Sequence, residues 1–149
     1  MQALILEITN HINTYRAKHS SPSLQWDDSI ATFSQSWAQY LATNAKFEHS
    51  KDARYGENLA CFMGNPDNML TLVKKSIDMW YNEISKYDFQ KNTYVPGTGH
   101  FTCLIWKSST KFGIGYAYDA KTKSAIVVLN TSPAGNHLSL FKSNVFPAK

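Results

Sequence analysis

The sequence predicts an α+β fold in which helices pack on a small sheet. Three stretches before residue 86 place apolar residues at helical spacing, the primary signal of amphipathic helices. Two later runs, 112–118 and 124–129, have the composition of strands. The chain has 149 residues, of which 43% are hydrophobic, so one domain of ordinary size can bury a core. Because no repeat, linker or low-complexity segment interrupts it, we expect a single domain over residues 1–149.

The first two helices are predicted in the N-terminal third of the chain. Apolar spacing predicts a helix over residues 4–15, and a Ser-Pro-Ser run at 21–23 ends it. Asp27 or Asp28 is the expected cap of a second helix, which extends to about Phe47. The apolar stripe of that helix consists of Ile30, Phe33, Trp37, Leu41 and Ala45.

The clearest helical pattern follows a break at Asn65-Pro66-Asp67, with Asp67 as the expected N-cap. A loop from 87 to 99 comes next. It is rich in aromatics and glycine, fits neither periodicity, and is long enough for a functional role. A short element is expected over 100–106. The stripe of the helix consists of Leu70, Val73, Ile77, Trp80 and Ile84.

The strand-like runs 112–118 and 124–129 are expected to pair as an antiparallel hairpin. The polar segment 119–123 between them has the length and composition of a hairpin connection.

Charge and composition argue against nucleic acid and membrane-spanning classes. The net charge is +4 and the pI is about 9.0, but the basic residues are scattered, with Lys74-Lys75 as the one adjacent pair. This gives weak attraction to anionic surfaces and no nucleic-acid footprint. No stretch is long and apolar enough to span a bilayer, and no signal peptide is recognisable. Two cysteines, Cys61 and Cys103, are expected to be reduced thiols of an intracellular protein, although a secreted protein whose signal peptide was removed would begin similarly.

Four titratable residues lie beside signals that interrupt regular structure: His49, Glu57, Glu83 and His100. Imidazole nitrogens bind zinc or copper, and a nearby carboxylate can fix the tautomer of a histidine or hold a water molecule. The four do not share a helical i, i+4 face, so spacing alone leaves open a common site or unrelated surface and capping groups.

Residues 99–106 read Gly-His-Phe-Thr-Cys-Leu-Ile-Trp. The stretch is similar to the signature Gly-His-Phe-Thr-Gln/Ala-x-x-Trp of the CAP superfamily of cysteine-rich secretory, antigen 5 and pathogenesis-related proteins. Cys103 is the difference. Tyr116 and Leu129 stand where secreted members typically carry cysteine, so the chain most resembles the intracellular, Golgi-associated branch. Other matching motifs follow the family order: His11-x-Asn13-x-Tyr15-Arg16, His49-Ser50, Gly56-Glu57-Asn58-Leu59, Trp80-Tyr81-x-Glu83 and Pro133-Ala134-Gly135-Asn136.

The resemblance implies an α-β-α sandwich, with a small central antiparallel sheet between helical layers and an open cleft. Carried over by motif, the cleft tetrad is His49, Glu57, Glu83 and His100. In the family the two histidines bind a divalent metal ion, usually zinc, and the glutamates orient water or ligands. Two neutral nitrogens make a sparse ligand set, so we expect weak, pH-dependent zinc binding by His49 and His100.

The resemblance further implies a non-enzymatic binding protein. Family members bind lipids such as sterols, fatty acids or anionic phospholipids, and the intracellular branch is peripheral on Golgi-type membranes and forms homodimers. We therefore expect a lipid or sterol ligand, an anionic membrane surface and a homodimer as partners, in the cytoplasm or on such membranes. The loop spacing Tyr87-x-Phe89-x-x-x-x-Tyr94 fits a caveolin-binding-type pattern of sterol-binding members. Aromatics beside a core also act as packing residues, which is the alternative for these three.

Two other functions stay open at this stage, a hydrolase and a protein-interaction module. Some family schemes use a serine nucleophile shortly after the Gly-Glu-Asn motif, and Met63 occupies that place here. Cys61 is two residues away and would share the face of a strand with Met63, which keeps a thiol nucleophile under consideration. Cys103 is expected to be buried and inert. His19 and His137 are expected at the surface.

Overall fold

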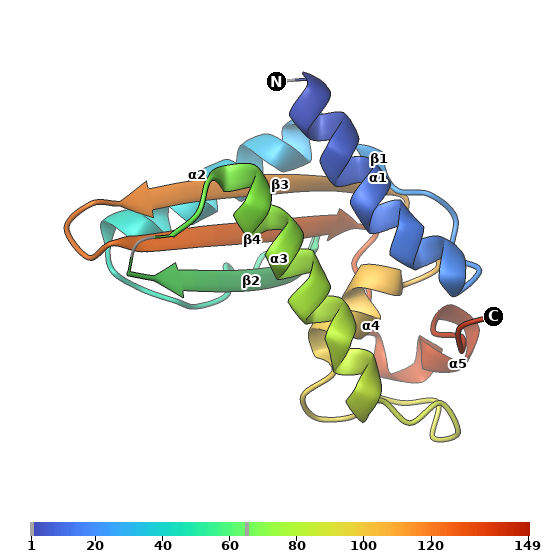
Figure 1. Ribbon diagram of the computed structural model, residues 1–149. Coiled ribbons are helices and arrows are strands. Elements are labelled where there is room, and N and C mark those ends of the chain that lie inside the picture. The colour runs from blue at the N-terminus through green and yellow to red at the C-terminus, as the bar shows by residue number, and fades with distance from the viewer. Residues whose placement is uncertain (1, 65) are drawn as a thin grey trace.

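The fold is built on a sheet that lies between two helical layers. The structure, a computed structural model, describes residues 2–64 and 66–149. In Figure 1, α2 (Asp28–Thr43) lies behind the sheet, while α1 (Gln2–Lys18) and α3 (Met69–Asn82) lie in front of it. This arrangement confirms the α-β-α sandwich.

The sheet of the described ranges contains four strands in the order β1 (Gln25–Trp26), β3 (Lys111–Asp119), β4 (Ser124–Ser132) and β2 (Gly56–Met63). β3 and β4 form the predicted antiparallel hairpin, and β2 pairs antiparallel with β4. The two-residue β1 pairs parallel with β3, so the sheet is mixed rather than wholly antiparallel. β2 was not assigned from periodicity, because its consecutive central residues are buried on both faces and leave no alternation to read.

Asp27, one of the two expected caps, is the N-cap of α2, and its carboxylate accepts a hydrogen bond from the Ile30 N–H at 3.0 Å. The predicted end at Phe47 is wrong, because the helix stops at Thr43. Ala45 has a φ of 51°, a left-handed conformation that a right-handed helix cannot contain. Phe47 therefore lies in the connection to β2.

The buried face of α2 differs in part from the predicted stripe, because Phe33 and Trp37 are only half-buried. Ile30 and Leu41 are buried as predicted, and small residues join them, since the backbone of β3 comes very close to the helix. A Cβ added to Gly113 or Gly115 would collide with the backbone of α2. The residues buried on this face are Ile30, Ser34, Ala38, Leu41 and Ala42.

The N-cap of α3 is Asn68, one residue later than the predicted Asp67. The Asn68 side chain accepts a hydrogen bond from the Thr71 N–H at 3.0 Å. Asp67 instead pairs with Lys75, with 2.7 Å between Oδ2 and Nζ. Both residues can cap a helix, so composition could not choose between them. Asn65 of the predicted break lies outside the described residues.

Short helices complete the described chain. A 3₁₀ turn, η1 (Glu83–Lys86), continues from α3, and the aromatic loop after it leads to α4 (Gly99–Ile105), which is the predicted short element. Near the C-terminus, η2 (Leu138–Leu140) and α5 (Phe141–Asn144) follow the last strand.

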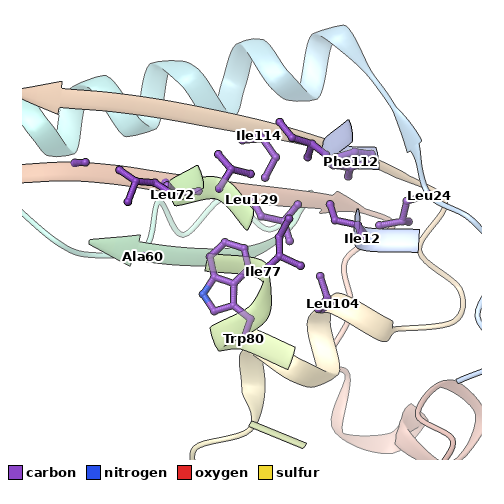
Figure 2. Close-up of a cluster of buried hydrophobic side chains, with 14 residues drawn as sticks. Ile12, Leu24, Ala60, Leu72, Ile77, Trp80, Leu104, Phe112, Ile114 and Leu129 are labelled. Carbon is purple, nitrogen blue, oxygen red and sulfur yellow. The ribbon is translucent and has the colours of Figure 1, made fainter. Parts of the chain in front are cut away.

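The main hydrophobic core lies on the face of the sheet that carries α1 and α3. Figure 2 shows Ile77 and Trp80 of α3 near Leu129 of the sheet, with Ile12 of α1 and Leu104 of α4 on the same side. All five side chains are at most 2% exposed. Full burial of a side chain of this size contributes roughly 1.5–3 kcal/mol, so this layer fixes the ends of α3 and α4 against the sheet.

Arg16 is a fully buried cation that ties α1 to the segment after α4. Its guanidinium donates hydrogen bonds of 3.0 Å to the carbonyls of Leu104, Trp106 and Ser109, and one of 2.9 Å to that of Pro22. Burial lowers the pKa of Arg16 to about 10. The conformation of residues 104–109 therefore depends on this side chain.

The prediction that His19 lies at the surface is wrong, because its side chain is fully buried. The C-terminal segment folds back over the end of α1, and the Phe146 carbonyl accepts a hydrogen bond from His19 Nδ1 at 2.7 Å. The Tyr81 hydroxyl lies 2.8 Å from Nε2. His137, by contrast, is exposed as predicted.

Candidate functional site

The four predicted cleft residues form two histidine–glutamate pairs that line one pocket. His49 Nδ1 lies 2.9 Å from Glu57 Oε1, and His100 Nδ1 lies 2.7 Å from Glu83 Oε2. The four side chains share a pocket of about 300 Å³ with residues that include Tyr94. Tertiary structure therefore brings together four residues that are widely separated in the chain.

The first pair rests on a carboxylate that is almost completely enclosed. The Glu57 side chain is 8% exposed, whereas that of His49 is 57% exposed. Ser50 donates to Glu57 from its N–H at 2.8 Å and from its hydroxyl at 2.7 Å. Asn130, fully buried on β4, donates from its amide at 3.0 Å. Glu57 thus accepts hydrogen bonds from three residues and holds His49 in a fixed orientation.

The electrostatics of the pair favour its charged form. Burial acts to raise the pKa of the Glu57 carboxyl, but hydrogen bonds from His49, Ser50 and Asn130 outweigh it, and the pKa is lowered. The hydrogen bond to Glu57 raises the pKa of His49 above its ordinary value, against the opposing effect of desolvation. His49 therefore loses its proton at a higher pH than an isolated histidine.

The second pair is positioned by α3 and α4. Glu83 follows the end of α3, and its other oxygen, Oε1, accepts a hydrogen bond from the Phe101 N–H at 3.0 Å. His100 is in the first turn of α4, where the Asn58 amide donates to its carbonyl at 3.0 Å. The His100 ring stacks on Trp80, with 6.1 Å between centroids. Contacts from β2 and α3 therefore fix both the backbone and the ring of His100.

His49 and His100 each have one ring nitrogen that could bind a divalent ion. In each pair Nδ1 is bound to a carboxylate, and no hydrogen bond of residues 2–64 and 66–149 engages the Nε2 of His49 or His100. A histidine with Nδ1–H on a carboxylate and Nε2 turned to a metal is a common arrangement in metalloproteins. Within the same ranges, no group of three or more His, Cys, Asp or Glu side chains is arranged to hold a metal. Two nitrogens are thus available, and water would complete the coordination.

The three aromatic loop residues have different environments. Tyr87 is 8% exposed, and Phe89 is half-buried against it and against Phe101. These two are packing residues of a second core beneath the loop. Tyr94 is 44% exposed and lines the tetrad pocket. Burial thus leaves Tyr94 as the one of the three that is open to a ligand.

The two thiols lie apart from the tetrad. Cys103 is buried as predicted, and burial raises the pKa of its thiol to about 11. Cys61 is half-buried, and burial also raises the pKa of its thiol. It lines a different pocket together with Met63. A thiol there is not positioned to accept activation from His49 or His100.

A larger groove was not foreseen from the sequence. It has a volume of about 700 Å³ and lies between the start of α1, α2 and β3. Its walls come from separate elements, so no single motif indicates it. The apolar residues that line it are Leu4, Ile5, Ile8, Trp26, Ala31, Met69, Ile114 and Tyr116.

The sequence analysis did not identify Asn130 as a residue of the site, although its position in the sequence indicates a buried polar group. It is a polar residue that directly follows the apolar run 125–129, and such a residue in a buried strand needs a specific partner. Its partners are Glu57 and the Ser34 hydroxyl, which donates to Asn130 Oδ1 at 2.8 Å.

No helix of the described ranges is long and apolar enough to cross a lipid bilayer.

The sequence model of the cysteine-rich secretory protein family, CAP, matches residues 9–131. The chain is 35% identical over 148 residues to the human Golgi-associated plant pathogenesis-related protein 1, covering 96% of this chain and 92% of that protein. It is 35% identical over 127 residues to pathogenesis-related protein 1A of Nicotiana tabacum, covering 84% of this chain and 72% of that protein.

The fold is also similar to that of solved structures. The crystal structure of NaASP2 with Zn²⁺ superposes with a TM-score of 0.73 at 18% sequence identity, covering 99% of this chain and 85% of that chain. At this level of identity the likeness concerns the arrangement of the elements.

Proposed function

Since the chain belongs to the cysteine-rich secretory protein (CAP) family, we propose that it is a non-enzymatic binding protein that holds a lipid or sterol. The observation that carries this proposal is the apolar groove of about 700 Å³. Its volume lies within the range of roughly 300–1,000 Å³ that small-molecule sites occupy. Apolar residues dominate its walls, and the Ser36 hydroxyl on α2 is among the polar groups that line it.

The lipid proposal is tested by filling the groove from its polar side. Thr32 is an exposed residue of α2 that lines the groove, so Thr32→Trp adds a large ring to the cavity without altering the core. Thr43→Trp is the matched control, because Thr43 is exposed on the same helix but does not line the groove. Binding of a fluorescent fatty acid and of a fluorescent sterol is measured for both variants. We expect at least tenfold weaker binding for Thr32→Trp and unchanged binding for Thr43→Trp; equal binding by both variants contradicts the groove as the site.

The tetrad is proposed to bind a divalent metal ion, zinc first, with His49 and His100 as the protein ligands. The free Nε2 atoms and the carboxylates behind Nδ1 support this assignment. A bound ion would supply positive charge and exchangeable water positions next to Tyr94 at the pocket wall. Calorimetry with a His49→Ala, His100→Ala double variant tests it, and zinc binding identical to that of the unmodified chain would refute the site.

Membrane association is proposed as peripheral and electrostatic. The net charge of +4 gives attraction to anionic headgroups of about 1 kcal/mol for each basic residue near the surface. A Golgi-associated human relative supports Golgi-type membranes as the location. Flotation with anionic and with neutral vesicles tests the electrostatic part of the proposal. Equal recovery of the protein with both kinds of vesicle would contradict an electrostatic contribution to binding.

A homodimer is the proposed assembly. Sedimentation velocity over a range of concentrations measures it directly, and a single monomeric species at the highest concentration would contradict it.

A hydrolase using the same pocket is the alternative function. Its supporting feature is the pair of histidines with carboxylate partners, which suits activation of water. Against it, the place of the serine in the family scheme is held by Met63, a thioether without nucleophilic character toward carbonyl groups. The Ser50 hydroxyl donates to Glu57 rather than to an imidazole. Absence of activity toward ester and peptide substrates, with and without zinc, is therefore the expected result.

A further inference from the structure

Two sulfur atoms meet on β2, away from the histidine tetrad. Cys61 and Met63 are separated by one residue, so their side chains project from the same face of the strand. The distance between Cys61 Sγ and Met63 Sδ is 3.8 Å. From this pairing we propose that the two side chains form a binding site for a soft monovalent metal ion, Cu(I).

The pair lines a hollow that an ion can reach. Met63 is 69% exposed and Cys61 is half-buried, and both line a pocket of about 220 Å³. Leu41 and Ile126 form part of its apolar wall, and Phe47 lies at its exposed side. The two sulfur atoms thus lie at the boundary between solvent and an apolar surface.

The orientation of the thioether is fixed by a neighbouring strand. The Ser124 hydroxyl on β4 lies 3.2 Å from Met63 Sδ and donates a hydrogen bond to it. Register pairs Met63 with Ser124 directly across the two strands. The sulfur keeps a further lone pair for a metal, so the hydrogen bond and coordination are compatible.

The chemistry of the donors selects the ion. Thiolate and thioether are soft ligands that prefer Cu(I), whereas Zn²⁺ in proteins is held by thiolates, imidazoles and carboxylates. An ion about 2.3 Å from each sulfur, the metal–thiolate distance of zinc sites, would span the observed gap at an S–metal–S angle of roughly 110°, which suits three-coordinate Cu(I) with one ligand from solvent. A thiolate with a monovalent ion has no net charge, which suits an apolar wall and avoids repulsion by Lys46 at the pocket.

Binding requires only the loss of a proton. The Cys61 thiol releases its proton to solvent as the sulfur–copper bond forms, and copper stays in the Cu(I) state throughout. Because burial raises the pKa of this thiol, the proton competes with the metal and affinity increases with pH.

The site is separate from the tetrad. Cys61 is four residues beyond Glu57 on the same strand, which is about 13 Å at roughly 3.3 Å per residue. The two pockets have no lining residue in common. The sulfur pair and the histidines can therefore be varied independently.

The test is a competition titration with a chromophoric Cu(I) chelator under anaerobic, reducing conditions. The folded chain is compared with Cys61→Ser, Met63→Leu and the His49→Ala, His100→Ala double variant. We expect one bound equivalent of Cu(I), at least tenfold weaker binding in both sulfur variants, and unchanged binding in the double variant. X-ray absorption of the copper-loaded chain is expected to show two sulfur neighbours.

Matched controls keep the result interpretable. Met79→Leu changes another exposed methionine, on α3, and is expected to bind as the unmodified chain does. Circular dichroism and thermal melting verify that every variant is folded. Binding that survives Cys61→Ser overturns the proposal. Binding that Met63→Leu leaves unchanged overturns it as well, because the thiol would then act without the thioether.

Discussion

His49 Nδ1 and Glu57 Oε1 are 2.9 Å apart, which joins a largely exposed imidazole to a carboxylate that is 8% exposed. The buried partner fixes the orientation and tautomer of the exposed one. The pair therefore links a solvent-facing nitrogen of His49 to the hydrogen bonds that hold Glu57, and either residue can be replaced to test this link.

Replacing the buried carboxylate should change the titration of His49. Glu57→Gln removes the charge that raises the pKa of His49, so we expect that pKa to fall toward the ordinary histidine value. NMR titration of the histidine rings measures it. Glu83→Gln is the matched control, because Glu83 is hydrogen-bonded to His100 and not to His49. An unchanged His49 titration in Glu57→Gln would show that the pair does not control the imidazole.

Zinc affinity should decline as the pH falls through the raised pKa of His49. The metal needs a neutral imidazole, so protonation of His49 competes with binding, and each pH unit below the pKa weakens it up to about tenfold. Calorimetry between pH 8 and about pH 5.5 measures this dependence. The pairing of His49 with Glu57 also affects the free energy of unfolding, with the opposite dependence on pH. It stabilises the fold below the unfolded-state pKa of histidine, and this stabilisation is lost as the pH rises through the raised pKa of the folded state. The exposure of His49 keeps that term small.

Buried His19 should make stability depend on pH in the other direction. Burial lowers the pKa of His19, so the unfolded chain binds a proton at a pH where the folded chain does not. Its contribution is complete above the unfolded-state value and declines as the pH falls toward the lowered folded-state value. Denaturant unfolding between these two pKa values should show that the free energy of unfolding depends less on pH in His19→Gln than in the unmodified chain. His137→Gln, at an exposed histidine, should keep the original profile.

Adding a methyl group between α2 and the sheet should be destabilising. In Gly115→Ala the new Cβ would collide with the Ser34 backbone, so helix and strand must separate, at a cost of about 1–3 kcal/mol or more. Gly64→Ala is the comparison, because that site has open space around it and a φ of 92°. The strain of that conformation alone costs roughly 1–2 kcal/mol. Urea unfolding of both variants measures the two costs, and a cost well below about 1 kcal/mol for Gly115→Ala would indicate that the close approach tolerates a Cβ.

Local patterns in the sequence were sufficient for most elements. The strand-like composition of 112–118 and 124–129 and the polar segment between them predicted the hairpin correctly. The cap of α2 was narrowed to Asp27 or Asp28, because a capping side chain bonds the backbone only three residues later, and the structure selects Asp27. The errors at Asp67 and Phe47 concern boundaries, where several residues have similar local preference.

The candidate site was predicted through its resemblance to a family, since spacing alone left the four tetrad residues unconnected. Their meeting depends on β2, which periodicity did not identify, and on the start of α4 beside the end of α3. Asn130 and Ser50, which hold Glu57, gain their roles only from the pairing of β2 with β4 and from the turn before it.

The sequence by itself determined the three long helices, the hairpin of β3 and β4, and the residue types that are available for chemistry. Those properties depend on interactions within a few residues of the chain. Tertiary structure alone decided that His19 is buried, that Cys61 and Met63 share a pocket, and that a groove opens between α1, α2 and β3. The physical reason is that burial and cavity shape depend on which distant segments pack together, and a linear pattern does not contain that information.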